Sequence, residues 1–356
     1  MKAIFLFLLG WLLYSCSTDY KNDLSGSTNT FITEFPITLS IAAEELEIEI
    51  PGIHEIYSLD DYFIGVNYTG SNNFLHVYDK KDFTLLTSLI SRGRGPDEFL
   101  TMKYINQWGK DSEGVYTWIA DINSNKLCKL NLCKSIELNE LVFNEYINSI
   151  DMSQVYDIFV VDDSLVCLTP MISKEIGQNE VQFFNLKDSN ICKTHQLYKK
   201  DFNKCINEQI YQIKSIIRPD KTMMVAFGNT FSRFHIFNLD FSKVNTYTVY
   251  NDISEKSVNI ALNEREISDL KRHYTNFIAT NEVIFGLYAN KYSEDIHSNK
   301  ANGGMEIHMF NWKGAALTKI LIKENIWQIT IDEKEKVLYG ITANEQLYRY
   351  DLSGIL

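Results

Sequence analysis

The chain has 356 residues, of which 45% are apolar and 13% aromatic, and its formal net charge is −12. This composition supplies a large buried core and excludes a disordered chain. The acidic balance, without any cluster of lysine and arginine, argues against nucleic-acid binding, which needs a basic footprint. It argues equally against attachment to anionic lipid through a basic face.

The N-terminus has the pattern of an export signal. Lys2 precedes an apolar run from Ala3 to Leu13, which is too short to span a bilayer as a stable helix. The run ends in Leu13-Tyr14-Ser15-Cys16, which resembles the bacterial lipobox, although Tyr14 departs from it. The resemblance implies that residues 1–15 are a lipoprotein signal peptide and that Cys16 is the lipid attachment site. An ordinary secretory signal with a coincidental cysteine is the alternative.

Export and lipidation define where we expect the protein to be. We expect the N-terminus to contact the membrane through the lipid on Cys16. We also expect the protein to be an outer-membrane lipoprotein that faces the periplasm or the cell surface. Residues 16–30 are polar and rich in Gly, Ser, Thr and Asn, which predicts a flexible tether. Residues 31–356 then form the folded domain.

An exported protein can form disulfide bonds, but the cysteines of this chain do not define a disulfide pattern. Five remain besides Cys16, and an odd number cannot all pair within the chain. Cys128 and Cys133 flank one predicted hairpin turn and could face each other across it. The alternative is that the cysteines are buried and free, as small apolar residues. There is no Cys-x-x-Cys spacing, so a zinc or thioredoxin-like site has no support.

One short sequence motif recurs along the chain and predicts its architecture. An Asp or Asn follows a large apolar residue at the end of a predicted strand, and a polar turn comes next, as in Asn73–Leu89. These Asp and Asn residues stand at positions 79, 131, 185, 238, 311 and 351. Six copies of a hairpin-bearing unit at intervals of 40–73 residues predict an all-β fold, a six-bladed β-propeller of four-stranded antiparallel blades.

The predicted blades cover residues 53–90, 102–143, 155–197, 211–250, 274–322 and 326–356. In the second blade, Ser135–Val142 is the expected fourth strand. The sixth blade has only three strands of its own, which would leave an exposed edge and a poorly closed ring. We therefore expect an N-terminal strand, either Phe35–Ser40 or Leu46–Ile50, to complete the last blade.

Two insertions interrupt the repeat. Ser257–His273 has helical spacing of apolar residues, with Asn263 as a possible N-cap, and it predicts one small helical insertion between blades four and five. Tyr292–Gly304 is a polar loop inside blade five. Either could be surface decoration, or a lid over one mouth of the ring.

The crossover between blades one and two reads Ser-Arg-Gly-Arg-Gly-Pro-Asp-Glu-Phe, from Ser91 to Phe99. Its glycines and proline fix a tight backbone path. It lacks the Lys-Ser/Thr ending and the following helix of a P-loop. It is either a shaped crossover anchored by Phe99 or a binding rim, whose candidate residues are Arg92, Arg94, Asp97 and Glu98.

Together with the lipobox, Gly93–Phe99 gives the chain a specific resemblance. Gly-x-Gly-Pro-x-Glu-Phe after a first blade resembles the TolB-like and NHL-like six-bladed propeller lipoproteins of Gram-negative bacteria, with Asp97 in place of the usual third glycine. The resemblance implies an exported scaffold and no transferable catalytic set. Some related propellers are enzymes, including metal-dependent lactonases and amidating lyases, and these hold their metal on the central axis.

Three histidines occupy equivalent places in the repeat. His76, His235 and His308 each stand three residues before the repeated Asp or Asn, in the third strand of their blades. Third strands lie about 10 Å out from the innermost ones, too far for shared coordination of one metal ion. We therefore expect core or interface histidines, with no metal site, no cofactor and no catalytic residues among them.

Two functions remain open. The favoured one is a non-enzymatic, lipid-anchored binding or scaffold module for a protein, peptide or glycan, with no nucleic-acid partner. The alternative is a metal-dependent hydrolase or lyase with its site in the central channel. Carboxylate, Asn or His side chains converging on the axis would favour the enzyme, and an aromatic or featureless funnel would favour the binding module.

Overall fold

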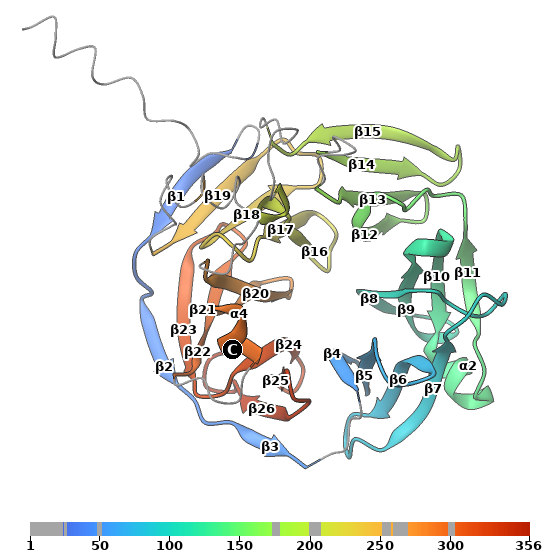
Figure 1. Cartoon of the computed structure of the whole chain (residues 1–356), viewed down its shortest axis with the longest axis horizontal. Helices are drawn as coiled ribbons and strands as arrows, with labels where there is room; N and C mark the ends of the chain where they lie inside the picture. The colour runs from blue at the N-terminus through green and yellow to red at the C-terminus, as the bar shows by residue number, and fades with distance from the viewer. Residues whose placement is uncertain are drawn as a thin grey trace, which may run out of the picture.

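The computed structural model describes residues 24, 27–47, 52–172, 179–198, 208–250, 258, 270–297 and 303–356. They form a ring of six sheets around a central axis, each built on four antiparallel strands and running outward from an innermost strand (Figure 1). The prediction of a six-bladed propeller is confirmed.

Blades one to three are built from consecutive strands, innermost first. Blade one is β4 (Ile53–Leu59), β5 (Tyr62–Asn67), β6 (Asn73–Asp79) and β7 (Leu85–Ser91). Blade two is β8 (Met102–Asp111), β9 (Gly114–Asp121), β10 (Lys126–Asn131) and β11 (Phe143–Ile147), with the short 3-10 turn η1 (Ile122–Ser124) after β9. Blade three is β12 (Val155–Asp162), β13 (Leu165–Pro170), β14 (Glu180–Asn185) and β15 (Asn190–Gln196).

Blades four to six follow the same plan, and each recruits one strand from the N-terminus. Blade four is β16 (Lys214–Ile217), β17 (Met223–Phe227), β18 (Arg233–Asn238) and β19 (Val244–Val249), preceded by the 3-10 turn η2 (Glu208–Tyr211). Blade five is β20 (Arg272–Ala279), β21 (Val283–Lys291), β22 (Met305–Asn311) and β23 (Ala316–Ile322). Blade six is β24 (Ile326–Asp332), β25 (Val337–Thr342) and β26 (Leu347–Asp351), joined by β3 (Glu44–Leu46).

In blades one, three and five, the recurring Asp or Asn makes the turn between the third and fourth strands. In blade one the Asp79 carboxylate accepts the backbone N–H of Lys81 at 2.8 Å, and in blade five Asn311 Oδ1 accepts that of Lys313 at 2.9 Å. This Asx turn brings the chain back on itself within four or five residues. The residue that completes the reversal has positive φ, as at Phe83 (57°) and Gly314 (78°). In these three blades, the repeat in the sequence is therefore a repeat of turn chemistry.

The apolar core lies between blades. The buried apolar residues of the described chain fall into six clusters, and each cluster joins two neighbouring blades. Between blades six and one, for example, Phe63 packs edge-on against Tyr339, with ring centroids 5.4 Å apart. Each blade is thus stabilised by both neighbours, and closure of the ring buries the last interface.

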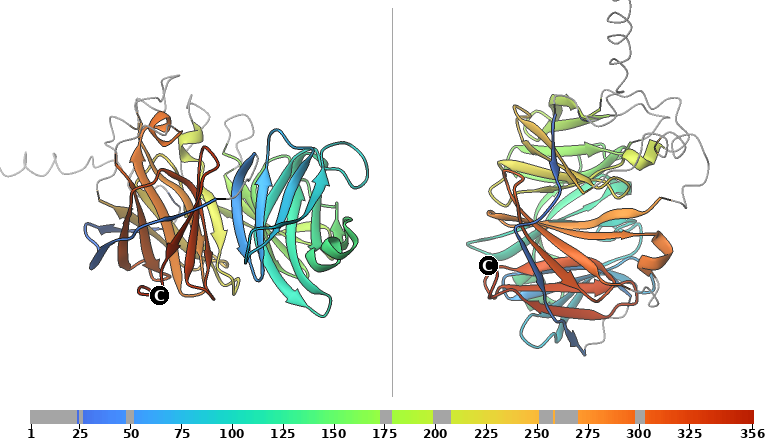
Figure 2. Two further views of the ribbon diagram at one scale, coloured as in Figure 1. Left: turned by 90° about the horizontal axis from the view of Figure 1, so that it is seen from below. Right: turned by 90° about the vertical axis from the view of Figure 1, so that its left-hand side faces the viewer.

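The N-terminal segment forms a belt of three strands around blades four, five and six (Figures 1 and 2). β1 (Thr28–Ile32) pairs parallel to β19, and β2 (Ile37–Ser40) pairs parallel to β23. β3 then pairs antiparallel to β26 and supplies the missing fourth strand of blade six. The predicted N-terminal closure is confirmed, because a free outer edge accepts a further strand.

Two details of the N-terminus differ from expectation. The closing strand is Glu44–Leu46, which shares only Leu46 with the expected Leu46–Ile50, while the other candidate lies on blade five as β2. Part of the segment expected to be a tether is also packed against the ring: Leu24 is buried and bridges Tyr198, and β1 starts at Thr28. Leu24, Ile32 and Phe35 are buried against the blades, whereas Phe31, Ile37 and Leu39 remain exposed.

The predicted fourth strand of blade two, Ser135–Val142, is wrong. Residues Leu132–Leu138 form a helix, α2, and the fourth strand β11 begins only at Phe143. Asn131, the repeated Asx residue of this blade, accepts the backbone N–H of Lys134 at 3.0 Å and caps the helix. The same polar side chain that begins a turn in other blades therefore begins a helix here.

The two predicted insertions have different outcomes. The expected helix within Ser257–His273 lies outside the described residues, apart from Val258 and the stretch from 270 onward, where Arg272 begins β20. The polar loop Tyr292–Gly304 contains a short helix, α4 (Ser293–His297), in its described part. In the described ranges, no helix is long and apolar enough to cross a bilayer.

The cysteines in the described chain are free. Cys128 and Cys167 are buried, Cys133 is half-buried and Cys192 is exposed. Cys128 lies in β10 and Cys133 in α2, so the expected contact across a hairpin turn is absent between these two residues. Cys205 lies outside the described residues.

Candidate ligand-binding channel

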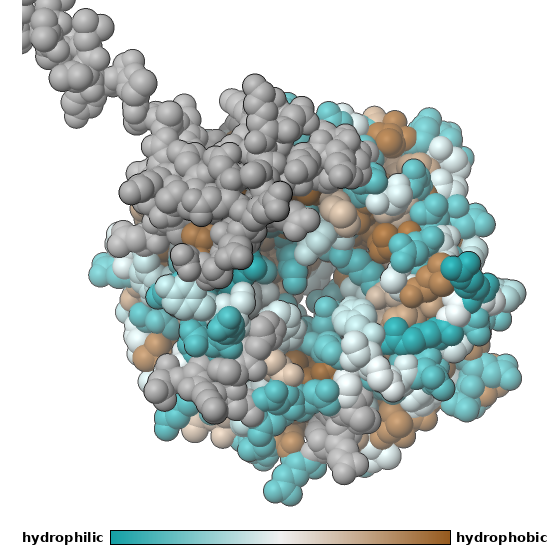
Figure 3. All heavy atoms as spheres, viewed as in Figure 1, coloured by the Kyte–Doolittle hydropathy of each residue, from teal (hydrophilic) through white to brown (hydrophobic). Residues whose placement is uncertain are grey.

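The innermost strands β4, β8, β12, β16, β20 and β24 surround a central channel, and Figure 3 shows hydrophilic side chains around its opening. Two cavities of about 320 and 410 Å³ follow one another along it. They share the lining residues Asn106, Ile216, Ile217 and Ile278. We name them the Glu55 chamber and the Asp332 chamber, after one acidic residue in each. Both volumes fall in the range of about 300–1,000 Å³ typical of small-molecule pockets.

Amide side chains lock the channel wall. Gln107 on β8 accepts the N–H of Val160 at 2.7 Å and donates to its carbonyl at 2.9 Å. Gln328 on β24 makes the same pair of bonds to Ile56, at 2.7 and 3.0 Å. Both glutamines are buried, and each joins the innermost strands of two neighbouring blades. Hydrogen bonds between neighbouring blades therefore stabilise the channel wall in addition to apolar contacts.

In the Glu55 chamber, the carboxylate that names it is held by two phenols. Glu55 Oε2 accepts the hydroxyl of Tyr57 at 2.7 Å and that of Tyr68 at 2.9 Å. Burial, reinforced by the nearby carboxylate, raises the pKa of both tyrosines well above its usual value, so both remain donors at neutral pH. Among the described residues, no cation pairs with Glu55.

The second acidic residue of this chamber is already paired. Lys103 Nζ lies 2.7 Å from Asp157 Oδ1 and also donates to the carbonyl of Tyr156. Asp157 Oδ2 accepts the backbone N–H of Ser215 at 2.8 Å, a bond from blade three to blade four. Burial raises the pKa of Tyr156 to about 12, and its ring lies under the Lys103 ammonium. This pair contributes polarity to the chamber without net charge.

Lys214 and Asn106 are two polar side chains of the channel lining that have no such partners. Lys214 stands at the start of β16 and lines the Glu55 chamber, half-buried. Asn106 lies at the boundary of the two chambers, exposed to the channel, in a left-handed conformation with φ of 55°. Throughout the described part of the chain, neither side chain has a hydrogen-bond or ion-pair partner. Both are therefore available to a ligand.

The Asp332 chamber contains ion pairs of its own. Lys80 Nζ lies 2.5 Å from Asp332 Oδ2, and Lys110 Nζ lies 2.6 Å from Asp60 Oδ2 at the chamber's edge. Lys221 is half-buried, and burial lowers its pKa. Over both chambers the lining has five acidic and six basic side chains, whereas the whole chain has 46 acidic and 34 basic residues. The channel is thus much less acidic than the rest of the protein.

The four candidate rim residues do not meet in the channel. Arg92 donates to the carbonyls of Ser71 (2.9 Å) and Asn67 (2.8 Å), and its guanidinium stacks on Phe74 at 3.8 Å. Glu98 accepts the N–H of Gly95 at 2.7 Å. These contacts are internal to the crossover and blade one.

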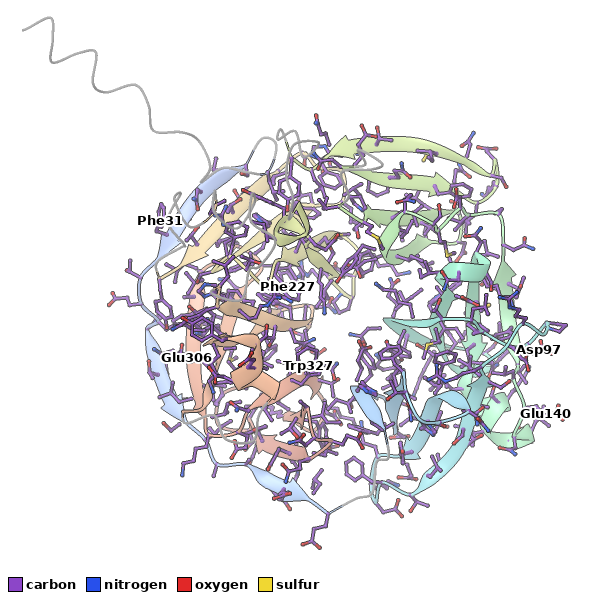
Figure 4. All side chains as sticks on the ribbon, in the orientation of Figure 1. Phe31, Asp97, Glu140, Phe227, Glu306 and Trp327 are labelled. Atoms are coloured by element: carbon purple, nitrogen blue, oxygen red, sulfur yellow. The ribbon has the colours of Figure 1, made fainter. Side chains whose placement is uncertain are left out.

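The other two rim candidates, Arg94 and Asp97, are exposed, and Asp97 lies at the outer circumference of the ring (Figure 4). Phe99 is fully buried, and its N–H donates to Ser91 O at 3.0 Å. The contacts fit the interpretation of a shaped crossover anchored by Phe99.

The three equivalent histidines lie in the third strands β6, β18 and β22, as predicted, and all are buried. His76 Nδ1 lies 2.9 Å from Ser88 Oγ, and His235 Nδ1 lies 2.9 Å from Thr246 Oγ1, both on the fourth strand of the same blade. Burial lowers the pKa of His235 to about 3. Their role as core residues is confirmed.

His308 is the most enclosed of the three. It lies 2.7 Å from Glu306 through Nε2 and 2.9 Å from the Tyr274 hydroxyl through Nδ1. Burial lowers its pKa, and Phe35 of the N-terminal belt packs against its ring at 4.5 Å. Within the described ranges, no three His, Cys, Asp or Glu residues lie close enough together to hold a metal ion.

The channel residues were not found from the sequence, although a signal was present. Each innermost strand contributes at least one polar or charged residue to the lining of the Glu55 chamber: Glu55, Lys103, Asp157, Lys214, Asn276 and Gln328. The six positions are spread over more than 270 residues and form no local motif. They come together only when the ring closes.

Comparison with known proteins agrees with the fold. The family model described as TolB-like 6-blade propeller-like matches residues 30–334. The chain belongs to this family. No curated protein matches this TolB-like chain.

Two solved structures share its fold. One, from Bacteroides fragilis NCTC 9343 and named as an exported protein, is 10% identical, with a TM-score of 0.56 over 90% of this chain and 99% of its own. The other, a member of the duf4221 family from Bacteroides vulgatus ATCC 8482, is 12% identical, with a TM-score of 0.51 over 92% of this chain and 94% of its own. At such identities the likeness of the TolB-like chain to both concerns the fold alone.

Proposed function

We propose that this protein is an exported binding module that takes its ligand in the central channel. The observation that supports this most is the pair of unpartnered polar side chains, Lys214 and Asn106, in a cavity built from all six blades. Lys214 is half-buried and Asn106 is exposed to the channel, so water can solvate both, and a ligand that displaces this water has to replace it as their hydrogen-bond partner. A ligand would supply those partners, whereas Arg92 and Glu98 at the crossover already have theirs.

The rigidity of the wall supports the same proposal. Gln107 and Gln328 fix neighbouring innermost strands to one another, so the cavity keeps its shape without ligand. A preformed site loses little conformational freedom when it binds. The candidate partner classes are a protein segment, a peptide or a glycan.

The experiment is a binding screen with the channel blocked in one variant. The mature chain with Cys16→Ser is screened by thermal shift against short peptides and acidic and neutral oligosaccharides. Ile216 lines both chambers, so Ile216→Trp fills the passage between them. Asp97→Ala at the outer circumference is the matched control, and it also tests the rim prediction. A ligand whose shift is lost with Ile216→Trp and kept with Asp97→Ala supports the channel, and the reverse pattern contradicts it.

We also propose that Cys16 is lipidated and anchors the module in the outer membrane. The lipobox-like motif supports this, and one structural neighbour is named as an exported protein. Wild-type protein should partition into the detergent phase and Cys16→Ser into the aqueous phase, since acyl chains bury many methylene groups. Wild-type protein without acyl chains in mass spectrometry would contradict the anchor.

A further inference from the structure

Two opposite charges without ion partners face each other across the Glu55 chamber. Glu55 is on β4 of blade one, and Lys214 is on β16 of blade four. In a ring of six these blades are directly opposed, and Figure 1 shows β4 and β16 on opposite sides of the central opening. Both residues line the same cavity of about 320 Å³. Over the described ranges, neither pairs with a residue of opposite charge.

The other charged residues of the chamber do not cancel this polarity. Lys103 and Asp157 are 2.7 Å apart on neighbouring blades and neutralise each other. The hydroxyls of Tyr57 and Tyr68 hold the Glu55 carboxylate in one place but add no charge. One wall is therefore anionic and the opposite wall cationic. A ligand that fits must bear a cation and an anion that are separated in space.

We propose that the Glu55 chamber binds a short zwitterionic peptide, with its N-terminal ammonium at Glu55 and its C-terminal carboxylate at Lys214. This rests on the proposed function, because it takes the channel as the binding site. Asn106 supports a peptide over other zwitterions: its free amide projects into the channel from a left-handed position and can both donate to and accept from a peptide group.

Other ligand classes fit these walls less well. An acidic oligosaccharide has no cation for Glu55 and would place an anion near it. A neutral glycan would leave both charges unpaired. An ω-amino acid satisfies both charges but has no amide for Asn106. The walls thus distinguish ligand classes by charge, and Asn106 distinguishes peptides from simple amino acids.

The test is calorimetric titration of the mature chain with Cys16→Ser, using di-, tri- and tetra-alanine. The best-bound length is then compared with its N-acetylated and C-amidated forms and with 6-aminohexanoate. Removing either terminal charge should weaken binding to the wild-type site at least about tenfold. 6-Aminohexanoate should bind more weakly than the peptide. Failure of all three free peptides to bind would overturn the proposal.

Matched variants locate each end of the peptide. Glu55→Gln should weaken the free peptide at least about tenfold yet leave the N-acetylated form unaffected, because that form has no ammonium to lose. Lys214→Met should behave likewise toward the C-amidated form. Lys243→Met, an exposed lysine outside the channel, is the control and should change nothing. Equal losses for free and blocked peptides would overturn the assignment, and thermal melts confirm that each variant is folded.

Failure here is distinguishable from failure of the channel proposal. If the broader screen yields a ligand that is lost with Ile216→Trp but is not a zwitterion, the channel remains the site and the peptide proposal is wrong. If Ile216→Trp leaves peptide binding intact, the peptide binds elsewhere and the inference is overturned directly.

Discussion

Replacing Gln328 by leucine should destabilise the ring at one joint between blades. Its side-chain amide makes two bonds to Ile56, accepting the N–H at 2.7 Å and donating to the carbonyl at 3.0 Å. Both residues are buried, so leucine would leave the N–H and the C=O of Ile56 without these partners. Each unsatisfied buried group costs about 1–3 kcal/mol, so losing both partners should lower the free energy of unfolding by roughly 2–6 kcal/mol.

The matched control for Gln328→Leu is the same substitution in the same blade. Gln346 is exposed, and its side-chain amide donates to Glu45 at 3.1 Å. Gln346→Leu should change the free energy of unfolding by no more than about 0.5 kcal/mol. Urea denaturation followed by tryptophan fluorescence measures both variants. Equal effects of the two substitutions would refute the idea that amide side chains lock the channel wall.

Three further predictions concern the belt, the buried histidines and the cysteines. Deleting residues 28–46 should lower the melting temperature sharply, because it removes β3 from blade six and exposes the edges of β19 and β23; an unchanged melt would show that the belt is dispensable. The free energy of unfolding should fall as pH drops below about 6.5, because the unfolded chain then binds a proton that buried His235 resists down to about pH 3. His235→Gln should reduce that slope in acid titrations, and an identical slope would contradict the assignment. Of Cys128 and Cys192, only exposed Cys192 should react with iodoacetamide in the native protein, since burial raises the pKa of the Cys128 thiol to about 12; mass spectrometry of the labelled chain checks this, and rapid labelling of Cys128 would contradict it.

The architecture was predictable because its signal is local. Asp79, Asn185 and Asn311 begin Asx turns that involve only the next few residues, so their blades are marked independently of one another. Closure followed from counting strands, since blade six needs one from elsewhere. The exact strand, Glu44–Leu46, was missed because its short sequence has no stronger alternation than its neighbours.

The prediction of secondary structure failed where one local sequence pattern is compatible with two structures. Asn131 fits both a turn and a helix N-cap, and the chain takes the helix α2. Arg92 was predicted as a candidate binding residue, but its guanidinium is used by the backbone carbonyls of Ser71 and Asn67. The sequence does not reveal such partners, because every residue has a backbone carbonyl. The channel residues Glu55 and Lys214 are 159 positions apart in the sequence, and only ring closure makes them face each other.

The most direct test of the channel as the binding site is a crystal structure of the protein with a ligand from the screen. The account predicts density inside the Glu55 chamber, within hydrogen-bonding distance of Lys214 and Asn106. Ligand density at the outer circumference beside Arg94 and Asp97, with the channel holding only water, would contradict it.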